Sequence, residues 1–190
     1  MKQKMKRVAA ALMAAVLGMT LLGACSSSDT KAAAGTSVGD FSMQDINGTT
    51  YTQDMFGDYD LTMVNVFATW CSPCVEEMPD LEKLYQQMAE RGVNVVGIVL
   101  DTTDENGEPI QEQLEQAQLL VKKTGVTYPV LLPDATGMNG RLRGINAVPE
   151  TFFVDKNGNF VGESYSGSAS LEDWRSIVEE KLVEIEKEDQ

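Results

Sequence analysis

Two cysteines spaced C-x-x-C are the residues of this chain whose types and spacing are best suited to chemistry. Cys71 and Cys74 enclose Ser72 and Pro73, and Cys25 is the third cysteine of the chain. A zinc site needs four ligands, and the chain has no histidine to complete one. A structural disulfide normally closes a longer loop, because the stabilisation grows with loop length. The spacing therefore predicts a redox pair, with no metal and no cofactor.

The elements on either side of the cysteines give each sulfur its expected role. Residues 61–67 are predicted to form a buried strand and residues 72 to about 91 a helix, which places Cys71 at the helix N-terminus. Free backbone N–H groups and the helix dipole stabilise a thiolate there, and thiol pKa values in such motifs fall from about 8.5 to roughly 3.5–7.5. We expect Cys71 to be an exposed, ionised nucleophile that forms a mixed disulfide with a substrate. Cys74, one turn further in, is expected to be buried and to resolve it.

Glu77 is the candidate proton acceptor for Cys74. At 100° per residue, the apolar positions of the helix share the face of Cys74: Met78, Leu81, Leu84, Tyr85 and Met88. Glu77 lies about 60° from Cys74 on the same side. A carboxylate beside an apolar stripe is desolvated and its pKa is raised, so it could act as a general base. The alternative is a glutamate at the edge of the stripe whose carboxylate reaches water.

The rest of the domain alternates strand-like and helix-like segments. Asn47-Gly48 carries a hairpin signal, and Gly125 ends a predicted helix. Strands are predicted at 93–100, 128–132, 151–154 and 160–162, and helices at 110–123 and 171–187. This order predicts an α/β fold with a mixed central sheet covered on both sides.

The N-terminal residues resemble a bacterial lipoprotein signal. Basic residues precede an apolar run over residues 8–22, which is shorter than the roughly 20 residues of a membrane-spanning helix. Leu22-Gly23-Ala24-Cys25 resembles a lipobox, in which the cysteine is lipidated. We therefore predict a signal peptide at 1–24, a flexible tether at 25–39 lipidated on Cys25, and the domain at 40–190. The alternative is a plain secretory signal with an incidental cysteine.

The chain is strongly acidic. It has 29 acidic and 15 basic residues, for a net charge of −14. Such a surface repels phosphate backbones, which argues against nucleic-acid binding. The acidic loop 101–108 does not have the ligand spacing of an EF-hand, so we expect it to be a solvated loop.

Two separate motifs resemble the TlpA/ResA-like thiol–disulfide oxidoreductases, a thioredoxin-like family related to the AhpC/TSA redoxins. The first is Asn65-Val66-Phe67-Ala68-Thr69-Trp70-Cys71-Ser72-Pro73-Cys74 followed by Glu77-Met78-Pro79. The second is Gly144-Ile145-Asn146-Ala147-Val148-Pro149-Glu150-Thr151-Phe152-Phe153-Val154-Asp155. The resemblance implies a thioredoxin-like fold with an N-terminal β-hairpin and a central strand–helix insertion. It also implies membrane anchoring outside the cytoplasm, and reduction of disulfides in client proteins such as apocytochrome c or a methionine sulfoxide reductase. A membrane thiol carrier of the CcdA/DsbD type is the implied electron donor.

The resemblance also implies roles for residues outside the cysteine pair. It makes Pro149 a cis proline opposite the cysteines, and it makes the backbone of Val148 a partner for the substrate backbone. It supports a functional glutamate at Glu77. Trp70 either shapes the docking surface or simply packs, and Glu150 brings an acidic group close to the site.

Three alternatives differ from a reductase. An oxidase of the same fold would introduce disulfides, and Ser72-Pro73 does not fix the direction. A peroxiredoxin-like thiol peroxidase would carry a threonine where Ala68 stands. A copper-delivery lipoprotein of the Sco type would need a wider cysteine spacing and a histidine, and this chain has neither.

Overall fold

The computed structural model describes residues 36–188. The predicted signal peptide, Cys25 and the tether up to residue 35 lie outside the described residues. Within residues 36–188, no helix combines the length and apolar character that crossing a membrane requires.

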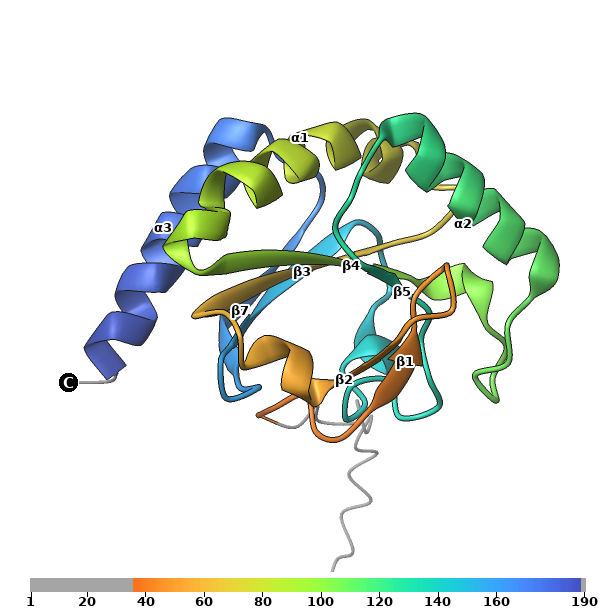
Figure 1. The fold of residues 1–190 in the computed structure, drawn as a ribbon, viewed down its shortest axis with the longest axis horizontal. Helices are drawn as coiled ribbons and strands as arrows, with labels where there is room; N and C mark the ends of the chain where they lie inside the picture. The colour runs from red at the N-terminus through yellow and green to blue at the C-terminus, as the bar shows by residue number, and fades with distance from the viewer. Residues whose placement is uncertain (1–35, 189–190) are drawn as a thin grey trace, which may run out of the picture. The chain divides into compact units, whose positions relative to one another are not determined.

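A mixed sheet of five strands forms the centre of the domain, in the order β5-β4-β3-β6-β7 (Figure 1). The strands are β3 Leu61–Phe67, β4 Val93–Val99, β5 Val130–Leu131, β6 Glu150–Asp155 and β7 Phe160–Ser166. β3 pairs in parallel with β4, and β4 with β5. β6 lies antiparallel to both β3 and β7. Every residue of β3 and β4 is buried, which explains why both segments consist mostly of apolar residues.

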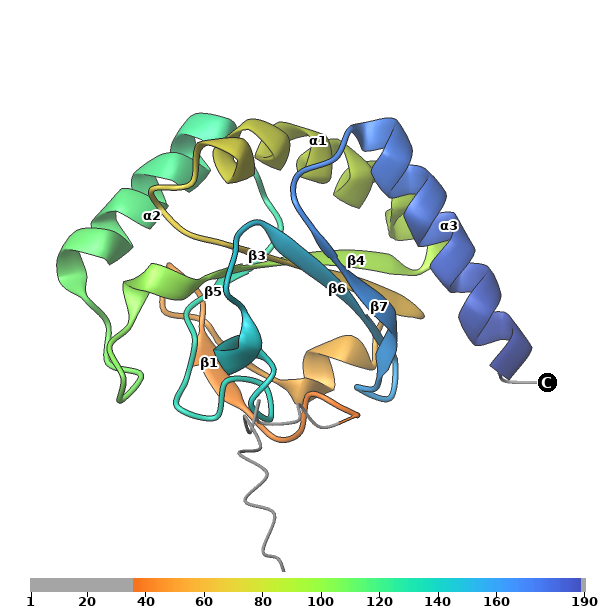
Figure 2. The ribbon, with the colours of Figure 1, turned by 180° about the vertical axis from the view of Figure 1, so that it is seen from behind.

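Different elements cover the two faces of the sheet. The helices are α1 Ser72–Met88, α2 Gln111–Thr124 and α3 Leu171–Glu188. All three lie on one side (Figures 1 and 2), and their apolar residues form one core with that face of the sheet. A second core on the opposite face includes residues from the hairpin of β1 Ser42–Gln44 and β2 Thr50–Thr52 and from the 3-10 helices η1 Gln53–Phe56 and η4 Leu142–Gly144. The predicted mixed sheet and N-terminal hairpin are confirmed.

Two strands differ in length from their predictions. β7 continues to Ser166, four residues beyond the predicted end. β5 is restricted to Val130–Leu131, because neither residue beside it donates its N–H to β4. Leu132 donates its N–H to the Gln44 carbonyl of β1 at 2.8 Å, and Pro129 has no N–H to donate.

Residues 36–38 already contact the end of the sheet. Val38 donates to the Gly158 carbonyl at 2.9 Å, and Phe160 donates to the Thr36 carbonyl at 3.0 Å. Val38 is buried. These contacts lie before Asp40, where the sequence places the start of the domain.

The register of β3 and β6 brings two distant motifs together. Val66, near the end of β3, pairs with Glu150, the first residue of β6. Cys71 follows β3 by four residues, and Pro149 immediately precedes β6. Because the two strands are antiparallel, both motifs lie at the same end of the sheet.

Candidate active site

The two cysteines form a disulfide at the N-terminus of α1. Their Cα atoms are 5.3 Å apart. Cys71 is the N-cap residue, and its Sγ accepts a hydrogen bond from the backbone N–H of Cys74 at 3.3 Å. The helix therefore begins where the sequence predicts. Its free N–H groups point toward the sulfur that we expect to carry negative charge in the reduced protein.

The expected exposure of Cys71 is wrong for this oxidised state. Cys71 is 3 % exposed and Cys74 is fully buried. The disulfide turns the Cys71 sulfur back onto the first turn of α1, where both cysteines join the core cluster against which Val148 packs. In the oxidised protein, a reacting partner therefore reaches the Cys71 sulfur only after the residues that cover it move aside.

Val148 and Pro149 lie at the same end of the sheet as the disulfide. The peptide bond between them is cis, as the resemblance implies. Pro149 is buried, and its carbonyl accepts a hydrogen bond from the N–H of Gly167 at 2.9 Å. Val148 is half-buried against the core cluster that contains both cysteines. Val148 and the cis proline are therefore at the same end of the sheet as the redox pair.

Glu77, three residues after Cys74 on α1, is buried and accepts hydrogen bonds on both carboxylate oxygens. The residue is 4 % exposed. Oε1 accepts from Asn65 Nδ2 at 3.0 Å, and Oε2 accepts from the Ala169 N–H and from Trp174 Nε1, each at 3.2 Å. The predicted burial is confirmed, and the alternative of a carboxylate that reaches water is wrong.

Burial raises the pKa of the Glu77 carboxyl above its usual value. The hydrogen bonds from Asn65, Trp174 and Ala169 act in the opposite direction, because they favour the charged form. A carboxyl with a raised pKa can exchange protons nearer to neutral pH than an ordinary glutamate. The predicted direction of the shift is confirmed.

Asn65 connects Glu77 to the central sheet. Its Nδ2 donates to Glu77 and also to Thr151 Oγ1 on β6 at 3.1 Å. The amide has no ionisable group, so the carboxylate of Glu77 is the acidic group of this buried cluster. The cluster joins β3, β6 and α1, and Glu77 lies three residues after Cys74 on α1.

Trp70 and Glu150 differ in solvent exposure. Trp70 is 70 % exposed, which favours the docking surface over packing. Glu150 is half-buried and forms an ion pair with Arg141, whose guanidinium lies 4.6 Å from the centre of the Phe152 ring. The acidic group near the site is therefore paired with a cation.

Sequence reasoning missed Asp101, which anchors the segment before the cysteines. Its carboxylate accepts from the Thr69 N–H at 3.0 and 3.2 Å and from Thr69 Oγ1 at 2.6 Å. The expectation of a solvated loop is thus wrong for Asp101, although Asp104 and Glu105 are exposed. Asp101 lies two residues after the end of β4, which pairs in parallel with β3, so its side chain reaches the segment that follows β3.

Trp174 and Ala169 were also missed as partners of Glu77. The spacing of apolar residues in the last helix predicts that Trp174 is buried, and this is confirmed. The spacing cannot show that the indole meets a carboxylate 97 residues earlier.

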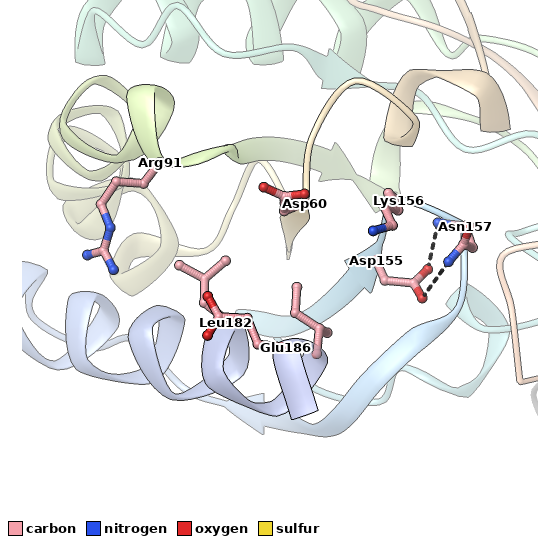
Figure 3. Close-up of a pocket in the computed structure, with 8 residues that line it drawn as sticks. Asp60, Arg91, Asp155, Lys156, Asn157, Leu182 and Glu186 are labelled. Carbon is pink, nitrogen blue, oxygen red and sulfur yellow. Dashed lines mark hydrogen bonds between the residues drawn. The ribbon is translucent and has the colours of Figure 1, made fainter. Parts of the chain in front are cut away.

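A separate pocket lies at the other end of the sheet (Figure 3). Its volume is about 360 Å³, and its lining includes Asp60, Arg91 and Asp155. These residues lie just before β3, just before β4 and at the end of β6. β3 is seven residues long, about 23 Å at 3.3 Å per residue, and Cys71 follows its far end. The pocket is therefore no part of the redox site.

Possible metal ligands do not gather in the described part of the chain. Residues 36–188 contain no group of three or more histidine, cysteine, aspartate or glutamate side chains arranged to hold an ion.

The family model for AhpC/TSA proteins matches residues 34–161 of the 190. The chain belongs to the AhpC/TSA family. Its similarity to thiol–disulfide oxidoreductase ResA of Geobacillus thermodenitrificans is 28 % identity over 177 residues, 92 % of this chain and 93 % of that protein. Thiol:disulfide interchange protein DsbE of Haemophilus influenzae is 34 % identical over 125 residues, 66 % of this chain and 61 % of that protein.

A solved structure resembles this AhpC/TSA-family chain in both fold and sequence. The thiol:disulfide interchange protein of Chlorobium tepidum has a TM-score of 0.63 at 30 % identity, over 77 % of this chain and 96 % of its own. The family, the relatives and the Cys71–Cys74 disulfide agree. The chain is a thiol–disulfide oxidoreductase with a thioredoxin-like fold.

Proposed function

We propose that this oxidoreductase is lipid-anchored outside the cytoplasm and reduces disulfides in exported client proteins. The observation that carries the proposal is the disulfide at the N-terminus of α1 together with the buried carboxylate of Glu77 three residues after Cys74. This arrangement provides a nucleophile, a resolving thiol and a proton acceptor in one place.

In the first step, the Cys71 thiolate attacks one sulfur of the client disulfide. A bond forms between Cys71 Sγ and that sulfur, and the other client sulfur leaves as a thiolate that takes up a proton. The helix N-terminus supports the reaction, because its N–H groups stabilise the thiolate of Cys71 before the attack.

In the second step, Cys74 gives its proton to Glu77 and attacks Cys71 Sγ. The bond between Cys71 Sγ and the client sulfur breaks, that sulfur leaves as a thiolate that takes up a proton, and the Cys71–Cys74 disulfide forms. The dithiol is oxidised by two electrons, which reduce the client disulfide to two thiols. The position of Glu77 one turn after Cys74 supports its role, since side chains three apart on a helix are neighbours.

Client docking would use Val148, Pro149 and Trp70. The half-buried Val148 precedes β6 at the redox end of the sheet, so its backbone can pair with an extended client segment. Trp70 offers an exposed ring directly beside Cys71. An exposed aromatic next to a reactive group is typical of a recognition surface.

The clients we propose include apocytochrome c and methionine sulfoxide reductases, and the donor is a membrane thiol carrier of the CcdA/DsbD type. A lipid on Cys25, followed by a tether over residues 26–39, would keep the domain near such a carrier. The lipobox-like residues 22–25 support the anchor. A diacylated cysteine would hold the protein stably, because each buried CH₂ group contributes about 0.8 kcal/mol.

Capture of a mixed disulfide tests the proposal. The full chain with Cys74→Ala cannot resolve its intermediate, so clients should accumulate on Cys71 and appear on non-reducing gels. The double variant Cys71→Ala/Cys74→Ala is the matched control and should capture nothing. Equal recovery of clients with both variants would contradict the proposal.

The reduction potential distinguishes a reductase from an oxidase of the same fold. We expect a value nearer to the roughly −270 mV of thioredoxin than to the roughly −120 mV of the strong oxidant DsbA. A reduction potential near that of DsbA would indicate an oxidase, which transfers electrons in the opposite direction to the one proposed. Rapid consumption of hydrogen peroxide by the reduced protein would instead favour a thiol peroxidase.

A further inference from the structure

One oxygen of Glu77 is held by the C-terminal part of the chain. Oε2 accepts from the backbone N–H of Ala169 and from the indole Nε1 of Trp174, both at 3.2 Å. Ala169 precedes α3, and Trp174 lies in its first turn. The carboxylate on α1 is therefore oriented from outside its own helix.

The indole of Trp174 has a fixed position. The residue is 1 % exposed, and its ring meets Tyr165 edge-on with centroids 6.1 Å apart. Tyr165 in turn meets Phe153 edge-on at 6.0 Å. A buried indole N–H is costly to leave unpaired, so the ring and the carboxylate of Glu77 hold each other in place.

The loop before α3 also contacts the substrate-binding segment. Gly167 donates its N–H to the Pro149 carbonyl at 2.9 Å, and Ala169, two residues later, donates to Glu77. One short loop thus bonds both the segment around Pro149 and the acid–base carboxylate.

We propose that residues 167–174, the positioning segment, fix the position of the Glu77 carboxylate relative to the cysteines. The same segment links this carboxylate to the loop that contains Pro149. Trp174 is the main positioning residue. The inference rests on the proposed role of Glu77. Trp174 touches neither the client nor the reacting sulfurs in this scheme, and it acts through Glu77.

The charged and polar groups around Glu77 determine how loss of the Trp174 indole donor changes the ionisation of the Glu77 carboxyl. Asn65 and Thr151 are neutral, whereas the buried Tyr128 is ionisable, and its pKa is raised by burial and then by the Glu77 charge. Tyr128 stays protonated at neutral pH. Loss of the Trp174 donor therefore acts chiefly on Glu77, and it disfavours the ionised carboxylate.

The test follows the resolving step in the reduced full chain. A mixed disulfide between Cys71 and 5-thio-2-nitrobenzoate releases a coloured thiolate when Cys74 attacks, and its rate is measured against pH. We expect Trp174→Phe to raise the midpoint of the profile by about one to two pH units, the effect of losing one hydrogen bond to a charged group. A midpoint equal to that of the wild type would overturn the inference.

Val178→Ala is the matched control for loosened packing of α3. Val178 is fully buried on the same helix and has no polar group, so its variant should lower stability and leave the midpoint in place. An equal midpoint shift in Val178→Ala would assign the effect to packing and overturn the inference.

A spectroscopic test does not depend on whether Trp174→Phe folds. In Trp70→Phe, Trp174 is the single tryptophan of the chain, and its emission should titrate with the midpoint seen in the kinetics. Adding Glu77→Gln should abolish the titration. Emission that is flat across that pH range would overturn the inference.

The Glu77→Gln variant distinguishes failure of the proposed function from failure of the positioning role alone. If Glu77→Gln had the same pH profile as the wild type, Glu77 would take no part in proton transfer, and the proposed function would lose its general base. If Glu77→Gln removed the profile and Trp174→Phe left it unchanged, only the positioning role would fail.

Discussion

Asn65 Nδ2 donates a hydrogen bond to Glu77 Oε1 at 3.0 Å in the buried layer between β3 and α1. The contact joins the strand that leads into the C-x-x-C motif to a carboxylate three residues after that motif. Asn65 is neutral, so it orients Glu77 without competing with it for the proton. The acid–base properties of the site therefore depend on the residue type at position 65.

Asn65→Asp should move the pH profile of the resolving step to higher pH. A second carboxylate about 3 Å from Glu77 would disfavour ionisation of both, and the pair would titrate with at least one strongly raised pKa. The nitrobenzoate-release assay measures this shift. Asn65→Leu removes the donor without adding charge, so its shift should be smaller; equal shifts in the two variants would contradict the like-charge explanation.

Glu77→Gln should slow the resolving step at neutral pH and flatten its pH dependence, because the amide cannot accept the Cys74 proton. Stopped-flow measurement of nitrobenzoate release gives the rate. The first step, attack by Cys71, should keep the rate of the wild type. A variant with unchanged resolution at every pH would remove Glu77 from the mechanism.

Glu77 should also make stability fall as pH rises. Its pKa is higher in the folded protein than in the unfolded chain, so the folded state retains a proton that the unfolded state has released. The free energy of unfolding therefore decreases from the unfolded pKa, about 4.3, up to the folded pKa, and Glu77 adds no further slope above it. Urea denaturation across this window should show a steeper decrease for the wild type than for Glu77→Gln, and parallel curves would contradict the shift.

The sequence was sufficient to predict those parts of the site that depend on local pattern. The apolar run of β3, the cysteine spacing and the helix start place Cys71 at an N-cap, and the helical period places Glu77 beside the buried stripe. These features depend on neighbours within a few residues. The exposure of Cys71 was predicted wrongly, because the cysteine spacing and the helix start do not show that Cys71 packs into the core cluster.

The contacts that complete the site could not be predicted in this way. Trp174 meets Glu77 across 97 residues, and Asp101 meets Thr69 across 32. Each depends on which strand ends adjoin and on which face α3 packs. Apolar periodicity predicts that Trp174 is buried, but it does not identify the acceptor of the indole N–H.

Asp101→Ala should lower the free energy of unfolding by about 1.5–3 kcal/mol, the usual range for hydrogen bonds to a charged group. The substitution removes the acceptor of the Thr69 backbone N–H and of its hydroxyl. Urea denaturation measures the loss. Glu105→Ala, an exposed position in the same loop, should change stability by less than about 0.5 kcal/mol, and an equal loss in both variants would contradict the anchoring role.

Trp70→Ala should weaken client reduction with little effect on stability. The exposed ring makes few packing contacts to lose, so the free energy of unfolding should change by less than about 0.5 kcal/mol. The KM for a protein disulfide should rise, while reaction with a small disulfide such as oxidised glutathione should change less. A large loss of stability would show that the ring packs instead of docking.

The rate of iodoacetamide alkylation of the reduced protein against pH tests the central claim most directly, with the modified cysteine located by mass spectrometry. Cys71 should react first, with a midpoint clearly below the roughly 8.5 of an unperturbed thiol, and Cys74 should be protected. First modification of Cys74, or a Cys71 midpoint at or above about 8.5, would contradict the assignment of Cys71 as the nucleophile.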